Sequence, residues 1–434
     1  MPVNAIANSN VIPIKRAFNK LIKTQFPLKR LIGPQNKYLR DGAFESPNIT
    51  PSNLNADHIC QYIAASIISH CFDGWNFLSR GIEAFLNGDI PTTIHLIYYS
   101  ELRSVMSIMA NNGIGVFNRK HVYFNLSSNA VFIINSTHPA AHELFEAWAA
   151  SPSHKEKVLK LIKVNSRSLF DWITASSIAT SSSFSTLIVK HWLQKWSLDL
   201  QLRDDRTIRN ESSYRPHFVT NNIDVSENFE NLISIWRLLE PNTQNRFNLL
   251  DTFLFRLAIE STFENTIGHT IKHRQYVPFV QDIFTNLGES QNQYLFEFTL
   301  RRQQPLDPFL LTEAKKDLNK RKINYKDPFP MICRAILLNR LATGFVDDYL
   351  VESGINKNLL NFWWEDIAQK LGITSTSPSG ITPVDLYTDI SDAIEIINSN
   401  ISNINSVSDC IKNYAPEINS LKQFQRTCFW GLGL

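Results

Sequence analysis

The sequence predicts an all-α protein, in which a multi-helix bundle with a small β-hairpin excursion is followed by a C-terminal helical domain. Apolar residues recur at helical spacing through most of the 434 residues, whereas short apolar runs typical of strands are few. Neither a parallel-sheet pattern nor a GxGxxG or GxxxxGK[ST] motif occurs. These observations argue against a Rossmann or P-loop nucleotide-binding fold.

The chain is long enough for two or three domains with at least one large core. Turn-forming residues at 46–53 separate a basic arm at 1–55 from a helical domain at 56–220. The break at Arg215-Pro216 divides that domain from a C-terminal helical domain at 221–434.

The first helical domain is predicted to begin at Ala56. The segment 56–87 forms one helix or two helices joined near Asp73-Gly74, and a second helix at 92–111 ends at a Gly113 cap. Three short apolar runs between 114 and 134 then predict a small hairpin. Further helices are predicted at 139–150, 153–163, 166–178, 184–209, twice within 225–272, and at 276–288, 291–302, 308–321, 328–352, 357–371, 383–400 and 417–430.

Bulk charge does not point to a nucleic-acid-binding protein, because the net charge is only +3 at pH 7. The arm at 1–55 differs, since it holds eight Lys or Arg residues against Asp41 and Glu45, about +6 in all. Two interpretations stay open. The arm contacts phosphate or a partner, or it is a solvated extension with a short amphipathic helix near 13–25.

The five cysteines are scattered without CxxC spacing, which predicts reduced thiols and a cytoplasmic protein. Cys60 and Cys71 fall in an apolar helical stretch and are predicted to be core residues. No zinc or cofactor motif is present, so neither a metal nor a cofactor is expected. No signal-peptide pattern and no uninterrupted run of about 18 apolar residues occurs, so no membrane span is expected.

The helix at 92–111 carries an unusual carboxylate. Glu101 falls in the middle of its apolar arc, where a charge is costly unless it is paired. His95, Tyr99 and Arg103 follow one another at four-residue spacing on a flanking stripe. These residues form either a polar binding network with an acid pointing inward, or a structural salt bridge from Glu101 with the stripe on the surface.

A second polar group surrounds the end of the helix predicted at 184–209. Arg209 lies near the helix C-terminus, where a cation suits the helix dipole, and Pro216 places His217 just beyond the helix. An Arg and a His near one another can serve RNA cleavage, since Arg stabilises phosphate charge and His moves protons. Alternatively, 203–217 is a charged helix end packed by Tyr214.

The phrase Arg209-Asn210…His217 resembles the signature of HEPN domains, small helical bundles found in RNases of toxin–antitoxin and antiviral systems. The helix 94–110 is similar to the first part of YaaC-like bacterial HEPN relatives, and Arg209, Asn210, Tyr214 and Pro216 are similar to their later Arg-Asn…Tyr-Pro phrase. The resemblance covers about 56–220.

The resemblance implies a toxin-like or antiviral RNase in which an RNA 2′-hydroxyl attacks the adjacent phosphate without a metal ion. Arg209 would stabilise the phosphorane, His217 would be the acid or base, Asn210 would orient one of them, and a homodimer would pair two such motifs. Seven residues, with Pro216 among them, separate Arg209 from His217, a longer spacing than in the nuclease motif. The alternative is therefore a non-catalytic helical subunit that binds a partner or nucleic acid within a larger complex.

His121 stands beside Arg119 and Lys120 in the β excursion. It is predicted either to contact phosphate with these cations or to sit at a solvated hairpin tip.

Overall fold

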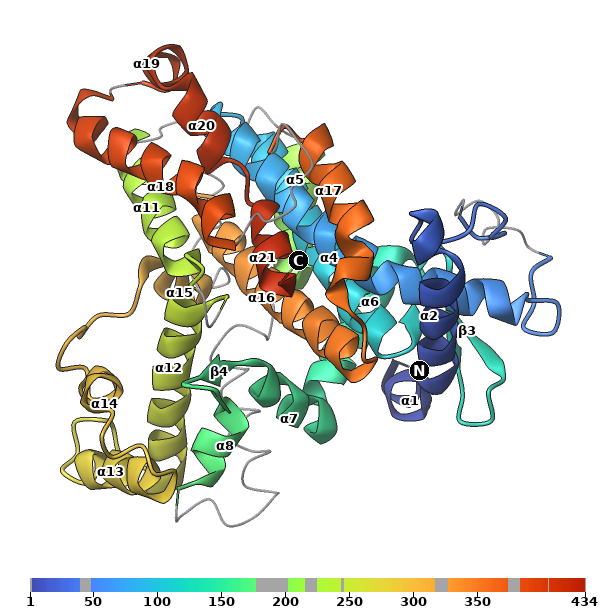
Figure 1. Ribbon diagram of the computed structural model, residues 1–434, viewed down its shortest axis with the longest axis horizontal. Coiled ribbons are helices and arrows are strands. Elements are labelled where there is room, and N and C mark those ends of the chain that lie inside the picture. The colour runs from blue at the N-terminus through green and yellow to red at the C-terminus, as the bar shows by residue number, and fades with distance from the viewer. Residues whose placement is uncertain are drawn as a thin grey trace. The chain divides into compact units, whose positions relative to one another are not determined.

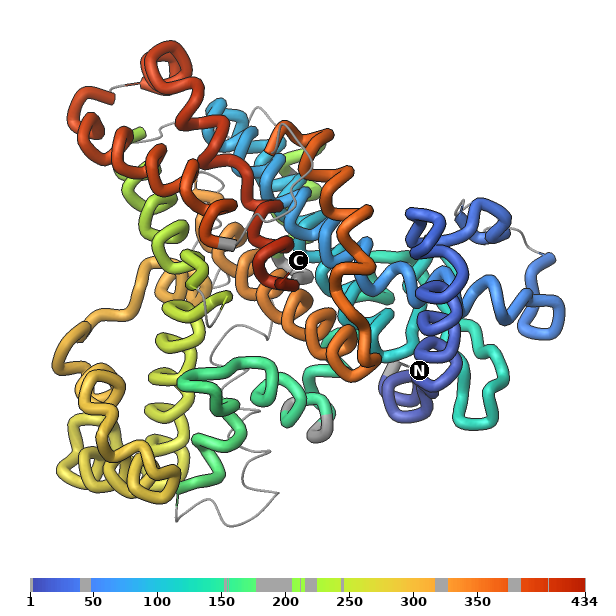
Figure 2. Tube along the Cα trace, viewed as in Figure 1, coloured from blue at the N-terminus to red at the C-terminus, as the bar shows by residue number. Residues whose placement is uncertain are grey.

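The computed structural model describes residues 2–39, 48–176, 202–214, 225–242, 246–316, 327–373, 383–404 and 406–433. It is 70% helix and 4% strand, so the mostly helical class is confirmed. The chain forms two compact units (Figures 1 and 2). Unit 1 comprises 1–148, 202–226 and 323–434, and unit 2 comprises 149–201 and 227–322.

Three long helices form the centre of unit 1: α4 (Ala56–Leu86), α5 (Ile90–Asn111) and α16 (Phe329–Glu352). α4 begins where the Asn55 side chain accepts a hydrogen bond from the His58 amide, and α5 begins with the same type of cap at Asp89. α4 is one continuous helix, not two. Gly74, the suspected break, instead lets α5 and α16 approach, because a Cβ there would overlap Asn339 Oδ1 and Ser104 Oγ.

A buried polar network joins these three helices around Gly74. Ser100 Oγ donates to the Gly74 carbonyl over 2.7 Å, and Asn339 Nδ2 donates to Ser100 Oγ over 2.8 Å. Ser104 Oγ donates to Asn339 Oδ1 over 2.7 Å. Each of these polar groups has a partner, so the network specifies the register of the three helices.

The N-terminal segment is part of unit 1 and is not a solvated extension. It forms α1 (Pro2–Asn8), α2 (Ile12–Thr24) and the 3₁₀ turn η1 (Phe26–Leu28). The predicted amphipathic helix is confirmed in α2, which packs against α4. Its buried face consists of Ile14, Ala17, Phe18 and Leu21.

The predicted β excursion is confirmed as a small antiparallel sheet and gains a third strand. β1 (Ile114–Gly115), β2 (Lys120–Phe124) and β3 (Ala130–Ile134) pair in that order, with Val122 opposite Phe132. β1 is only two residues long, which explains why the apolar pattern alone did not separate it from the turn that follows.

The remaining described helices of unit 1 surround this centre. α6 (Thr137–Ala150) follows the sheet, and α10 (Leu202–Tyr214) packs on α5. The C-terminal part contributes η4 (Lys357–Leu360), α17 (Asn361–Lys370), α18 (Pro383–Asn400), η5 (Ile401–Asn403), α19 (Val407–Asn413), α20 (Ala415–Leu421) and α21 (Arg426–Leu432). The two units do not follow the domain boundary predicted near residue 220. Residues 323–434 belong to unit 1, because α16 completes the core that α4 and α5 begin.

Unit 2 is built around α12 (Asn248–Ile267). The other elements are α7 (Pro152–Leu161), β4 (Lys163–Val164), β5 (Arg167–Ser168), α8 (Leu169–Thr174), α11 (Val225–Leu239, its first two residues in unit 1), α13 (Tyr276–Asn286), α14 (Gln293–Thr299) and α15 (Phe309–Ala314). The helix predicted at 166–178 is shorter, because β4 and β5 pair and a Ser168–Asp171 capping box starts α8. Trp172 then packs on Phe255.

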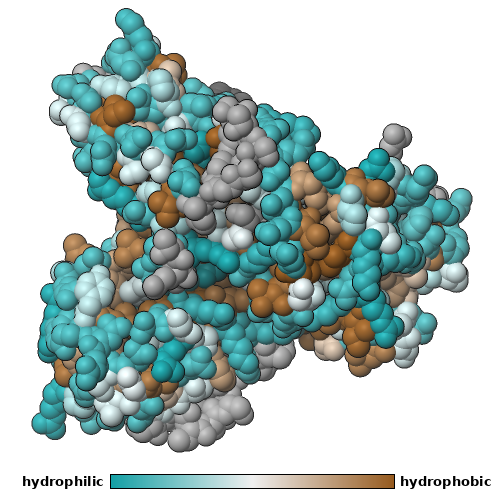
Figure 3. Space-filling model, in the orientation of Figure 1, coloured by the Kyte–Doolittle hydropathy of each residue, from teal (hydrophilic) through white to brown (hydrophobic). Residues whose placement is uncertain are grey.

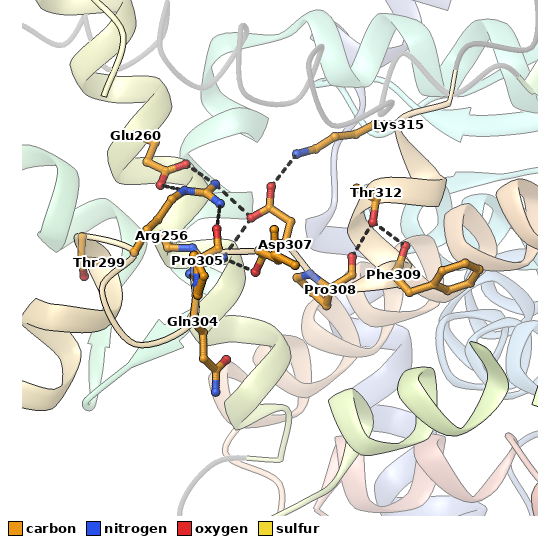
Figure 4. Close-up of polar contacts among 12 residues, drawn as sticks. Arg256, Glu260, Thr299, Gln304, Pro305, Asp307, Pro308, Phe309, Thr312 and Lys315 are labelled. Carbon is orange, nitrogen blue, oxygen red and sulfur yellow. Dashed lines mark hydrogen bonds and ion pairs between the residues drawn. The ribbon is translucent and has the colours of Figure 1, made fainter. Parts of the chain in front are cut away.

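Two arginines hold the loop after α14 in place (Figure 4). Arg256, fully buried, lies 4.6 Å from the Phe298 ring centroid and donates to the Leu306 carbonyl and to Asp307. Arg301 donates to both carboxylate oxygens of Glu260, over 2.6 and 2.8 Å, and to Asp307. The two cations and two carboxylates neutralise one another, so this network is a structural element of unit 2.

Among the described residues, α16 alone has the length and apolar character of a membrane span. Its most apolar stretch is 94% buried within the protein. A buried core helix of a soluble protein has the same length and apolar character. α16 is therefore weak evidence for a membrane, and the expectation of no span stays a prediction.

Candidate functional site

Three elements of unit 1 bring a cationic and aromatic group together, which we call the Arg209 cluster. It consists of His95, Tyr98 and Tyr99 on α5, His138 and His142 on α6, and Arg209 on α10. The helical repeat places His95, Tyr98 and Tyr99 on neighbouring positions of α5, and His138 and His142 one turn apart on α6. Arg209 reaches them because α10 lies along α5.

Arg209 binds to aromatic faces and has few hydrogen bonds. Its guanidinium carbon lies 5.1 Å from the Tyr98 ring centroid and 5.7 Å from that of Tyr99, within cation–π range. Its Nη2 lies 3.4 Å from His138 Nε2, at the limit of a hydrogen bond. Its Nε is buried and has no hydrogen-bond partner in the described part of the chain. Arg209 therefore retains an unused donor at Nε, which an anion would reach once the surrounding side chains move.

A chain of hydrogen bonds leads inward from Arg209. The Tyr98 hydroxyl lies 2.8 Å from His138 Nδ1 and 3.4 Å from His142 Nε2. One assignment satisfies every member: Arg209 donates to His138 Nε2, His138 Nδ1–H donates to Tyr98, and Tyr98 donates to His142. This assignment requires a neutral His138.

The environment keeps His138 neutral. Burial lowers its pKa to about 4, and the nearby charges of Arg209 and Arg206 act in the same direction. The pKa of His95 is lowered by burial and by Arg209, and its Nδ1 lies 2.9 Å from Ser213 Oγ. Both imidazoles are therefore neutral near pH 7, and an anion bound to Arg209 would raise their pKa values.

Glu101 lies one turn beyond Tyr98 on α5, in a second cluster with Asp205 and Arg334. All three residues are buried. Arg334 donates to both Asp205 oxygens, over 3.1 and 2.6 Å, so Asp205 and not Glu101 forms the salt bridge to a neighbouring helix. Burial first, and then the Asp205 charge, raises the pKa of Glu101 well above its usual value. Among the described residues no donor group bonds to either Glu101 oxygen, and as a protonated carboxyl Glu101 donates a hydrogen bond to Asp205.

Glu101→Gln is expected to make stability less dependent on pH. Between pH 4 and pH 8 the variant should lose less unfolding free energy than the parent does. The native parent holds a proton that unfolded Glu101 releases above a pKa of about 4.3, so its stability falls as pH rises from there towards the raised native pKa. The Gln amide keeps the hydrogen bond to Asp205 without that proton. Urea unfolding at the two pH values measures the difference, and equal pH dependence in both proteins would contradict an ionisable Glu101.

Two predicted binding residues have structural roles away from the Arg209 cluster. Arg103 points to α4, where its Nη1 lies 3.1 Å from His70 Nδ1, so the predicted stripe divides. His121 is buried and not at a solvated hairpin tip: its Nδ1 accepts from the Phe117 amide and its Nε2 donates to the Asn135 carbonyl, each over 3.0 Å. Burial lowers its pKa to about 4. A phosphate contact by His121 is thus excluded in this conformation.

The end of α10 is only partly described. Asn210 is half-exposed, and Tyr214 is 79% exposed, so Tyr214 does not pack the helix end. His217 lies outside the described residues, and its role stays a prediction.

Sequence patterns missed His138 and Tyr98, which belong to the Arg209 cluster, and the partnership of Asp205 with Arg334. His138 is 71 residues from Arg209 and Arg334 is 129 residues from Asp205, separations that helical periodicity does not bridge. The four-residue spacing of His138 and His142 was the available signal.

No group of three or more His, Cys, Asp or Glu residues able to hold a metal ion occurs in the described ranges. Comparison of the chain with protein-family models, curated proteins and solved structures gives no match. The case for a function therefore rests on the geometry of the Arg209 cluster.

Proposed function

We propose that unit 1 is a HEPN-like helical bundle that binds RNA at the Arg209 cluster and cleaves it without a metal ion. The observation that supports this most is Arg209 itself. Its guanidinium lies against the neighbouring rings of Tyr98 and Tyr99, its buried Nε has no partner among the described residues, and the neutral His138 and His95 lie beside it. A phosphate is the ligand whose geometry an arginine fork matches.

In the proposed reaction the RNA 2′-hydroxyl attacks the adjacent phosphorus, and the bond to the 5′-oxygen of the next nucleotide breaks. A neutral histidine takes the proton of the 2′-hydroxyl, and a protonated group gives one to the leaving oxygen. Arg209 stabilises the charge on the phosphorane. We assign the base to His138, and keep His217 as acid and Asn210 as its orienting group. The products are a 2′,3′-cyclic phosphate and a 5′-hydroxyl.

One observation favours a second function, a non-catalytic subunit that binds RNA or a protein partner. A pKa of about 4 makes His138 a weak base at neutral pH, unless bound phosphate raises it. The members of the cluster also satisfy one another along a continuous chain of hydrogen bonds. Such a site would bind phosphate and leave it intact.

The test is incubation of the purified protein with labelled mixed-sequence RNA in the presence of a chelator. We expect Arg209→Ala and His138→Ala to lower the cleavage rate by about 100-fold or more, as loss of a charge-stabilising or proton-transfer group does. Arg209→Lys, which keeps the charge without the fork, should fall in between. Arg274→Ala and His273→Ala in unit 2 are matched controls and should cleave at the parent rate.

The same assay separates the two functions. RNA binding that depends on Arg209 without cleavage would favour the non-catalytic subunit. Cleavage that survives both Arg209→Ala and His138→Ala would remove the cluster as its site. The variant His217→Ala, measured in the same assay, tests the proposed acid. The mass of the parent protein in solution tests the homodimer that the HEPN resemblance implies.

A further inference from the structure

We propose that the outward face of residues 16–37 in unit 1 is a binding surface for the phosphate backbone of single-stranded RNA. We call it the arm surface, and it consists of Arg16, Lys23, Lys29, Arg30 and Lys37. This inference rests on the proposed function for the identity of the polymer, but not for the existence of the surface.

The arm surface has an unbalanced charge. Residues 1–40 contain no Asp or Glu. Lys15 and Lys20 are neutralised from elsewhere, by Glu352 at 2.7 Å and Asp57 at 2.8 Å. The five cations of the arm surface are exposed and make no ion pair with a described residue. Unpaired cations on one short segment attract a polyanion, because binding releases its counterions.

The fold holds these cations in place. The apolar face of α2 is buried against α4, and Phe26 anchors the turn that follows it. Beyond the turn, the Asn36 side chain donates to the His58 carbonyl over 2.7 Å, and the Tyr38 hydroxyl accepts from the Asn55 amide over 2.9 Å. Because the segment is tied to α4 at both ends, binding orders little additional backbone.

Packing favours RNA over a lipid bilayer as the partner. An interfacial helix inserts its apolar face among the lipids, but that face of α2 is already buried in the protein. The outer surface around α2 is largely hydrophilic, with apolar residues gathered beside it (Figure 3). In the segment itself Leu28 is 61% exposed. Exposed leucines are common on protein surfaces, and Leu28 gives a residue with which to test the bilayer.

The arm surface and the Arg209 cluster lie along the same helix. Lys20 pairs with Asp57 near the start of α4, and Tyr99 of the cluster packs on Phe77, 5.6 Å between ring centroids. The twenty residues between Asp57 and Phe77 span about 30 Å of helix at about 1.5 Å each. The same twenty residues turn the helix by about 200°, so the two contacts face opposite sides of α4. A stacked strand rises about 3.4 Å per nucleotide, so more than about nine nucleotides are needed to reach from one to the other. Binding should therefore depend on RNA length.

The experiment measures binding of labelled RNA of 5 and 20 nucleotides to full-length protein carrying Arg209→Lys, which limits cleavage. The test variant adds Arg16→Gln, Lys23→Gln, Lys29→Gln and Arg30→Gln. We expect it to bind the 20-mer at least about tenfold more weakly, and its log–log salt slope to fall by about 3, since each contact contributes about 0.7. Binding of the 5-mer at the cluster should change by less than twofold.

The control variant removes the same charge elsewhere, through Lys272→Gln, Arg274→Gln, Arg302→Gln and Lys370→Gln. Equal loss in both variants, or parent-like 20-mer binding by the test variant, would overturn the proposal. A third outcome would show a membrane contact instead. In that outcome the parent binds vesicles with 30% phosphatidylserine, Leu28→Ala abolishes this binding, and the test variant binds RNA as the parent does. The test variant could bind the 20-mer more weakly while the parent protein shows no RNA cleavage. That result would support RNA binding by the arm surface and contradict the proposed nuclease activity.

Discussion

Arg334→Met is expected to lower the free energy of unfolding of unit 1 by about 3–5 kcal/mol at neutral pH, the usual cost of removing one partner from a buried ion pair. The substitution leaves Asp205 and Glu101, two fully buried carboxyl groups, without their cation. The native variant must then hold protons that the unfolded chain releases above about pH 4. The loss should therefore grow as pH rises. Hydrogen exchange of peptides from α5, α10 and α16 at pH 5 and pH 8 measures it for unit 1 alone.

A matched variant separates lost charge balance from lost packing. Adding Asp205→Leu and Glu101→Gln to Arg334→Met removes the stranded charges and should recover most of the stability, as apolar replacement of buried ion pairs often does. A loss below about 1 kcal/mol in Arg334→Met, or no recovery in the triple variant, would show that this cluster does not hold α10 to α16.

Gly74→Ala is expected to destabilise unit 1 by about 2–4 kcal/mol, although Ala is the better helix former by about 1 kcal/mol. The added methyl group would overlap the side chains of Asn339 and Ser104, and overpacking of this kind costs about 1–3 kcal/mol. Moving Asn339 also breaks its hydrogen bonds to Ser100 and Ser104, and a buried unsatisfied group costs about 1–3 kcal/mol. Thermal unfolding and hydrogen exchange of α4 measure the effect.

Gly81→Ala on the same helix is the control. A methyl group there would meet the end of the Ile97 side chain, which can move, and no polar network. We expect a change within about 1 kcal/mol, with the gain in helix propensity offsetting most of the contact. An equal loss at both glycines would indicate a general helix effect and contradict a special role for the polar network at Gly74.

The arm surface and the Arg209 cluster differ in how far they could be predicted. The excess of cations at 1–55 was visible because charge is counted along the chain, and the amphipathic helix near 13–25 because its apolar period is local. Of the candidate site residues, Arg209, His95 and Tyr99 do lie together. Arg103 and His121 do not, because Arg103 contacts His70 on α4 and His121 bonds to the loop between β1 and β2.

The sequence by itself determined the helical class, the positions of α4 and α5, the sheet between 114 and 134, and the need of Glu101 for a special environment. Each depends on residues within a few turns of one another, where periodicity and caps act. Only the tertiary structure decided that α4 runs unbroken through Gly74, that α16 completes the core, and that Asp205 takes Arg334 while Glu101 keeps its proton. It also brought His138 to Arg209. These outcomes depend on side-chain packing and on competition for one buried cation between residues more than a hundred positions apart, which no local pattern records.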